Sequence, residues 1–172
     1  MKKAILFDLD GTLLPMDQDI FIKTYFGLIA KRMARLGYKP EELIHTIWKG
    51  ISAVIKNDGA LTNEDVFWKC FSEVYGDEQT KNDRTKFDDF YREDFPKVQN
   101  TCGFQPFAKE MIQYAKQQGY RVVLATNPLF PRIATEERIR WAGLMPSDFE
   151  LVTTYENSHA CKPNLLYYQE IL

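Results

Sequence analysis

Cysteine, histidine and long apolar runs are all scarce in this sequence, and each scarcity excludes a class of protein. The 172 residues include three cysteines and two histidines. Cys70, Cys102 and Cys161 are odd in number and form no C-x-x-C pair, so they are predicted to be free thiols in a reducing compartment. No segment approaches the roughly 20 apolar residues that span a bilayer. The apolar start of the chain is interrupted at Asp8 and Asp10, too early for a secretory signal. We therefore expect a cytoplasmic protein with no membrane partner.

An excess of charge of either sign is also lacking. Lys and Arg number 22 against 24 Asp and Glu, which gives a net charge of -2. Binding to nucleic acid or to an anionic membrane requires a concentrated basic surface, so neither is expected as a partner. Hydrophobic residues make up 45% and charged residues 27%, both ordinary for a soluble globular protein. The length fits one domain, or one domain with a sizeable insertion.

Two kinds of segment alternate in the second half of the chain, and this alternation indicates the fold class. Short apolar or β-branched runs predict strands, which are expected at residues 3–7, 121–125 and 149–153. Helical segments that begin at a proline are expected at residues 106–118, 131–142 and 163–172. Strands alternating with helices are typical of a parallel sheet covered by helices on its faces.

A long stretch between the first strand and the remaining strands has helical periodicity throughout. Its apolar residues recur at helical spacing, Pro40 suits a first helical turn, and Thr62 suits a helix cap. Most of its aromatic side chains are expected to pack the helices together, with one or two facing a substrate: Phe21, Tyr25, Trp48, Phe67, Trp68 and Phe71. We predict an α/β protein with a Rossmann-like core from residues 1–14 and 97–172, and an inserted all-helical domain at 15–96.

Two carboxylates follow the first predicted strand. Asp8 and Asp10 are two residues apart, which directs both side chains the same way in an extended chain. Ligands of open parallel sheets bind beyond the carboxyl ends of the strands. Two acids there can hold a divalent cation, or serve as nucleophile and acid/base, since aspartate forms aspartyl-phosphate intermediates. A plain turn at Asp10-Gly11 or part of a calcium loop also fits the pattern, although further calcium ligands are missing.

Polar residues also follow the second and third predicted strands. Thr126 and Asn127 come after the second, where a hydroxyl and an amide can donate to phosphate oxygens, or can simply cap a turn. Lys162 precedes Pro163 after the third strand, where it can supply a positive charge to a phosphoryl group, or can be a solvated loop lysine. His159 is interpreted as a loop or capping histidine, and His45 as a surface or boundary residue.

The order and spacing of these features resemble the haloacid dehalogenase superfamily. The motifs are D8-L-D-G-T12, T126-N127 and K162-P163, and the resemblance covers essentially the whole chain. It implies a magnesium-dependent phosphatase acting on a small phosphorylated substrate, with Asp8 as nucleophile and Asp10 as acid/base. It also implies that Asp8 and Asp10 bind Mg²⁺, that Thr126, Asn127 and Lys162 bind phosphate, and that the helical block is a cap domain.

One motif of that family is missing. Family members continue with a further strand that ends in acidic residues and completes the magnesium site, whereas this chain ends at Leu172. We therefore expect a core that is incomplete at its carboxyl end, with the first strand left as an edge strand. Three alternatives remain open: a phosphosugar mutase, a phosphonate hydrolase of the same superfamily, and a catalytically idle fragment or pseudoenzyme.

Overall fold

A three-stranded parallel sheet forms the centre of the fold. The computed structural model describes residues 3–172, and its strands are β1 (Ala4–Phe7), β2 (Arg121–Leu124) and β3 (Leu151–Val152), in the order β1-β2-β3. Phe7 is in register with Leu124, and Leu124 with Val152, so the three strands end at the same edge. Polar residues that follow the strands are therefore brought to one edge of the sheet.

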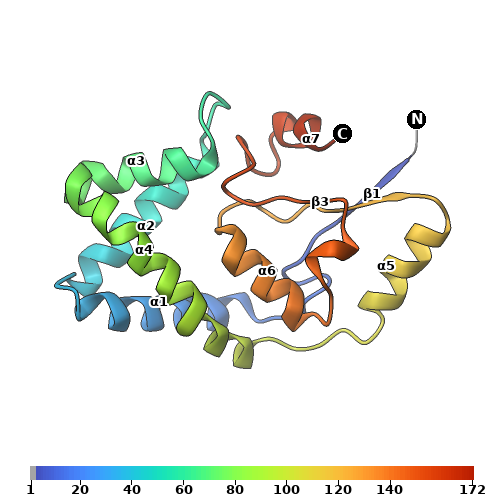
Figure 1. The fold of residues 1–172 in the computed structure, drawn as a ribbon, viewed down its shortest axis with the longest axis horizontal. Helices are drawn as coiled ribbons and strands as arrows, with labels where there is room; N and C mark the ends of the chain where they lie inside the picture. Colours follow the sequence, from blue (N-terminus) through green and yellow to red (C-terminus); the bar gives the residue numbers. More distant parts are fainter. Residues whose placement is uncertain (1–2) are drawn as a thin grey trace.

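Helices cover both faces of this sheet. The helices α5 (Ala108–Gln117) and α6 (Arg132–Trp141) lie on one side of the strands, and α7 (Leu165–Ile171) lies on the other (Figure 1). Side chains of β2 alternate between the two faces, as expected for a strand. One face joins the larger apolar core with α5 and α6, and the other packs against α7 in a smaller cluster. This burial on both sides explains the continuous apolar sequence of β2.

Four helices occupy the chain between β1 and α5. They are α1 (Gln18–Ala34), α2 (Pro40–Ile55), α3 (Asn63–Tyr75) and α4 (Asp77–Glu93), and the 3₁₀ helix η1 (Phe95–Thr101) follows them. We refer to α1–α4 as the helical block, which gathers on the left of Figure 1 while the sheet lies on the right. The hydroxyl of Thr62 accepts a hydrogen bond from the backbone N–H of Asp65 (3.1 Å), as predicted for a cap of α3.

The predicted elements are present, with shifts of a few residues at their ends. The third strand is shorter than the predicted 149–153, yet its pairing extends further: Glu150 N–H donates to the Val122 carbonyl (2.8 Å) and Thr153 N–H to that of Leu124 (3.0 Å). Within residues 3–172, β1 pairs with β2 alone and is therefore an edge strand. Two 3₁₀ helices, η1 and η2 (Pro146–Asp148), were not predicted.

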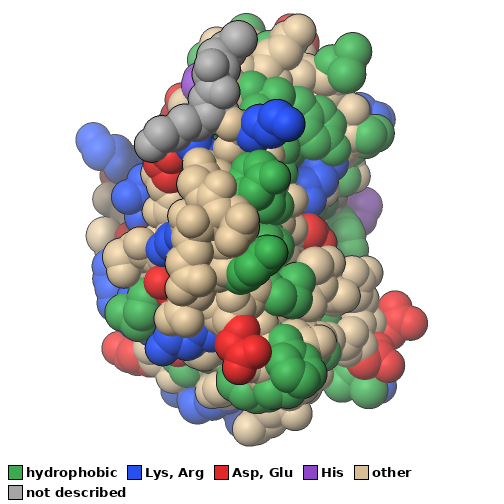
Figure 2. Space-filling model, turned by 90° about the vertical axis from the view of Figure 1, so that its right-hand side faces the viewer, with side chains coloured by type: hydrophobic (Ala, Val, Ile, Leu, Met, Phe, Trp, Pro, Cys, Tyr) green, Lys and Arg blue, Asp and Glu red, His purple; other side chains and the backbone are tan. Residues whose placement is uncertain are grey.

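Several large apolar side chains are exposed on the face that carries α5. Met111 and Tyr114 lie along this helix, and Phe104 and Phe107 precede it. The view from this side shows hydrophobic side chains distributed down the face among charged ones (Figure 2). No helix among residues 3–172 is both long and apolar enough to traverse a bilayer.

Candidate active site

A tight loop after β1 presents the two predicted acids at the carboxyl end of the strand. Gly11 N–H donates to the Leu14 carbonyl (2.8 Å), and Leu14 N–H donates to that of Leu9 (2.9 Å). Gly11 has φ of +78°, a conformation that residues with a Cβ adopt at a cost. Leu9 and Leu14 are fully buried, which anchors the loop while Asp8 and Asp10 remain partly exposed. The turn at Asp10-Gly11, which the sequence offered as an alternative, is therefore present in the same loop that carries the two acids.

Lys162 lies next to Asp8, although 154 residues separate them. The ammonium Nζ donates to Asp8 Oδ1 (2.7 Å), and the Thr12 hydroxyl lies within 3.4 Å of Asp8 Oδ2. The Asp8 side chain is 40% exposed, so its carboxylate is accessible from solvent. A lysine beside a carboxylate offsets its negative charge, which favours the approach of an anionic group. Thr12 belongs to the first motif but was not among the predicted site residues.

The loops after β2 and β3 are joined through Asn127. Its side-chain oxygen accepts a hydrogen bond from the backbone N–H of Lys162 (3.1 Å), so Asn127 positions the lysine. Thr126, which precedes it, is buried, and its carbonyl accepts from the hydroxyls of Thr153 (2.7 Å) and Tyr167 (2.9 Å). These contacts hold the backbone of the Thr126-Asn127 segment beside the Lys162 loop.

Arg138, which sequence analysis missed, is the partner of Asp10. Its guanidinium is buried, donates to Asp10 Oδ2 and lies 4.4 Å from the centre of the Phe130 ring. A further N–H lies 3.3 Å from the Thr135 hydroxyl. The other oxygen of Asp10, Oδ1, is buried and has no hydrogen-bond partner. A signal was available, because Arg138 lies one helical turn after Ala134 on the buried face of α6, where a charged residue needs a partner.

The acids at this edge fit a magnesium ion that takes most of its ligands from water and phosphate. Among residues 3–172, no group of three or more His, Cys, Asp or Glu side chains is placed to enclose a metal. Magnesium commonly uses only one or two carboxylates with water and phosphate. The Asp8 side chain is partly exposed and one Asp10 oxygen has no partner, so this donor set is compatible with such an open site.

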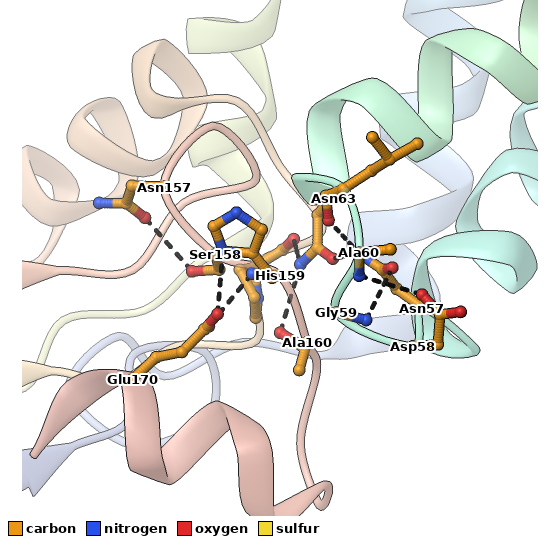
Figure 3. A network of polar contacts seen from close by, with 12 residues as sticks. Asn57, Asp58, Gly59, Ala60, Asn63, Asn157, Ser158, His159, Ala160 and Glu170 are labelled. Carbon is orange, nitrogen blue, oxygen red and sulfur yellow. Dashed lines mark hydrogen bonds and ion pairs between the residues drawn. The ribbon is translucent and has the colours of Figure 1, made fainter.

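A buried asparagine connects the helical block to both loops of the site. Asn63, at the start of α3, is fully buried, and its amide nitrogen lies 3.3 Å from the carbonyls of Pro128 and Ala160. Its side-chain oxygen accepts from Asn57 (2.8 Å), and its backbone N–H donates to the Ser158 carbonyl (2.8 Å). Figure 3 shows these contacts between the turn that precedes α3 and the segment before Lys162. Asn63 was also missed, because nothing in its local sequence distinguishes it from a helix-start residue.

The other candidate residues have structural surroundings. The His159 side chain pairs with Glu170 through Nδ1 and Oε1 (2.9 Å), which agrees with a loop role. His45 is exposed on α2, as predicted. Cys161 is buried, and this burial raises the pKa of its thiol to about 11, so the group is protonated near neutrality. It is therefore a packed residue, and all three cysteines are free thiols.

Comparison with known proteins identifies the family. None of the curated proteins matches the chain significantly. The family model of the haloacid dehalogenase-like hydrolases matches residues 2–172, which is nearly the entire sequence. This match agrees with the parallel sheet and with the acidic loop at the end of β1. The chain therefore belongs to the haloacid dehalogenase-like hydrolase family.

Proposed function

We propose that this hydrolase is a magnesium-dependent phosphatase that cleaves a small phosphomonoester through an aspartyl-phosphate intermediate. The observation that carries the proposal is the pair formed by Asp8 and Lys162, with Asn127 holding the lysine backbone. Phosphoryl transfer depends mainly on positioning and on compensation of charge, so a nucleophilic carboxylate beside a fixed cation suits it.

The reaction proceeds in two steps through these side chains. Asp8 attacks phosphorus, an Asp8–phosphorus bond forms, and the ester bond to the leaving oxygen breaks. Asp10 gives that oxygen a proton, because an alkoxide leaves poorly without one. Water then attacks phosphorus, Asp10 accepts a proton from this water, the Asp8–phosphorus bond breaks, and inorganic phosphate departs with Asp8 regenerated. Lys162 and Thr126 bind the phosphoryl oxygens throughout.

Arg138 fixes the orientation of the Asp10 carboxylate. Its guanidinium donates to Oδ2 of Asp10, which leaves Oδ1 as the oxygen without a partner. Asp8 and Asp10 would hold the magnesium ion, which would supply positive charge that offsets the charge of the phosphoryl oxygens facing the nucleophile. The halide released by a dehalogenase needs no proton donor, so an acid at position 10 favours a phosphatase.

The helical block acts as the cap of this site. Support comes from Asn63, which contacts the loop after β2 and the loop after β3 that carries Lys162. A cap in this place limits access of water and determines which leaving groups fit. In this assignment the core comprises residues 1–14 and 97–172, and the cap comprises 15–96.

Replacement of the nucleophile tests the proposal. Asp8→Asn should reduce hydrolysis of acetyl phosphate and 4-nitrophenyl phosphate by at least about 10³-fold, since the covalent step is lost. Asp19→Asn, at an exposed position of α1, is the matched control and should retain activity. During turnover the wild type should carry a phosphoryl group that hydroxylamine removes, and Asp8→Asn should carry none. Full activity of Asp8→Asn would refute the mechanism.

A further inference from the structure

An apolar cavity of about 170 Å³ lies between the helical block and the segment 129–131. Its wall is dominated by aromatic rings, among them Tyr25, Trp48, Phe67, Trp68, Phe130 and Tyr155. An apolar cavity of about 150 Å³ is large enough to bind benzene. Ile22 and Trp48, which also line it, are 37% and 43% exposed, so a ligand can enter from solvent. The cavity therefore has the size and the chemistry for one aromatic ring.

The polar groups on the cavity wall are already paired with one another. The hydroxyls of Tyr25 and Tyr91 are 2.9 Å apart, and the indole N–H of Trp68 donates to the Tyr155 hydroxyl (3.2 Å). Among the residues that the structure describes, no charged side chain lines the cavity. A polyhydroxylated group such as a sugar would lose its hydrogen bonds to water here without replacing them, which disfavours its binding.

Phe130 borders both the cavity and the Arg138 side chain that pairs with Asp10. Asp8, Asp10 and Lys162 do not line it, so a substrate must span the distance between the two. One face of Phe130 lies under the guanidinium of Arg138, which holds Asp10, and the same residue lines the cavity. Because Asp10 protonates the leaving oxygen in the proposed mechanism, the leaving group begins at Asp10. Phe130, which contacts the partner of Asp10 and lines the cavity, is an apolar surface along which it can extend.

We infer, on the basis of the proposed phosphatase function, that the substrate is the phosphomonoester of a small alcohol with an aromatic or similarly apolar body, which occupies this cavity. The same wall argues against the two enzyme alternatives. A phosphosugar mutase must recognise hydroxyls, and a phosphonate hydrolase needs a lysine near the leaving group. The cavity offers neither free polar partners nor a lysine in its described lining.

The test compares esters of similar intrinsic reactivity. Benzyl phosphate, glycerol 3-phosphate and glucose 6-phosphate are all esters of primary alcohols, so differences in kcat/KM report binding of the alcohol. We expect benzyl phosphate to be preferred by about 100-fold, because burial of several apolar carbons contributes to transition-state binding. Equal or greater kcat/KM for either polyol ester would overturn the inference and leave the phosphatase function standing.

A cavity-filling variant with a matched control locates the binding site. Ile51 of α2 lines the cavity, and Ile55, one helical turn later, is exposed and does not line it. Ile51→Phe should lower the ratio of kcat/KM for benzyl phosphate over acetyl phosphate about tenfold, whereas Ile55→Phe should leave this ratio unchanged. Taking the ratio corrects for any loss of folded enzyme. The same ratio in both variants would overturn the placement.

A binding measurement separates failure of the inference from failure of the proposed function. The phosphatase assignment itself would be overturned if the enzyme hydrolysed neither these three esters nor acetyl phosphate and 4-nitrophenyl phosphate. Titration with 4-nitrobenzyl alcohol, which quenches tryptophan fluorescence, then tests the cavity alone, because Trp48 and Trp68 lie on its wall. Saturable quenching that Ile51→Phe weakens supports an aromatic ligand site. Linear, non-saturable quenching overturns it.

Discussion

Replacement of Asn63 by alanine should be among the most damaging single substitutions in the helical block. The side chain is fully buried and joins three segments that are distant in sequence. Asn63→Ala removes its hydrogen bond with Asn57 and leaves the carbonyls of Pro128 and Ala160 without the amide donor. A buried acceptor that loses its partner keeps its desolvation penalty, so the cost exceeds that of an exposed hydrogen bond.

The expected magnitude follows from the number of contacts. Three contacts, with Asn57, Pro128 and Ala160, are lost at about 1 kcal/mol each, which gives a destabilisation of about 3 kcal/mol. For a chain of this length, 1 kcal/mol shifts Tm by roughly 2–4 °C, so Tm should fall by roughly 6–12 °C. Thr62→Ala is the matched control, because it removes only the cap of the same helix and should cost about 1 kcal/mol.

Thermal and urea unfolding measure the stability, and phosphatase kinetics well below Tm measure the site. Asn63→Ala should lower kcat more than Thr62→Ala, because it loosens the loops that carry Asn127 and Lys162. Asn63→Asp keeps an acceptor for Asn57 but loses both donors, so it should not restore either property. A Tm for Asn63→Ala within about 1 °C of the Tm of Thr62→Ala would refute the reasoning.

Three further predictions concern charge and protonation. Asp10→Ala should destabilise the fold by about 3 kcal/mol in urea unfolding, because it leaves the buried Arg138 guanidinium unpaired, and an unchanged midpoint would contradict this. The ammonium of Lys97 lowers the pKa of Asp94, so this carboxylate stabilises the fold above its unfolded pKa near 4, and the contribution is lost as the pH falls through the lower folded value. Asp94→Asn should therefore lower the free energy of unfolding by up to about 1 kcal/mol at pH 7 and by less in acid. A loss of stability that grows as the pH falls, measured by urea unfolding, would contradict this role of Asp94. Cys161, with a thiol pKa raised to about 11 by burial, should react with an aromatic disulfide reagent at pH 8 only after denaturation, as peptide mapping would reveal.

Local patterns were sufficient to predict that Asp8 and Lys162 lie at one edge of the sheet, whereas their catalytic roles stay a prediction. Asp8, Asn127 and Lys162 follow three parallel strands, and parallel strands bring their carboxyl ends to one edge whatever the details of packing. The helical content of residues 15–96 was equally accessible, because apolar periodicity is a local property. The exact ends of β3 could not be predicted from the local sequence, because they depend on hydrogen bonds with β2 rather than on the residues themselves.

The partners of the site could not be predicted in the same way. Arg138 and Asp10 are 128 residues apart, and Asn63 and Ala160 are 97 apart. A buried arginine or asparagine signals only that some partner exists, because which group supplies the partner is determined by how the helices pack. The cavity is a similar case: its aromatic residues were expected to form core, and only the packing shows where they leave a space.

The short segment between Asn127 and Pro131 both anchors the Lys162 backbone and forms part of the cavity wall. At one end Asn127 fixes the backbone of Lys162, and only two residues later Leu129 begins the wall of the cavity. An insertion or deletion here would displace the lysine anchor and reshape the cavity together. If the cavity holds the alcohol as we infer, its specificity should be changed by substitution on α1–α4, where the opposite wall lies, rather than by a change in the length of this segment.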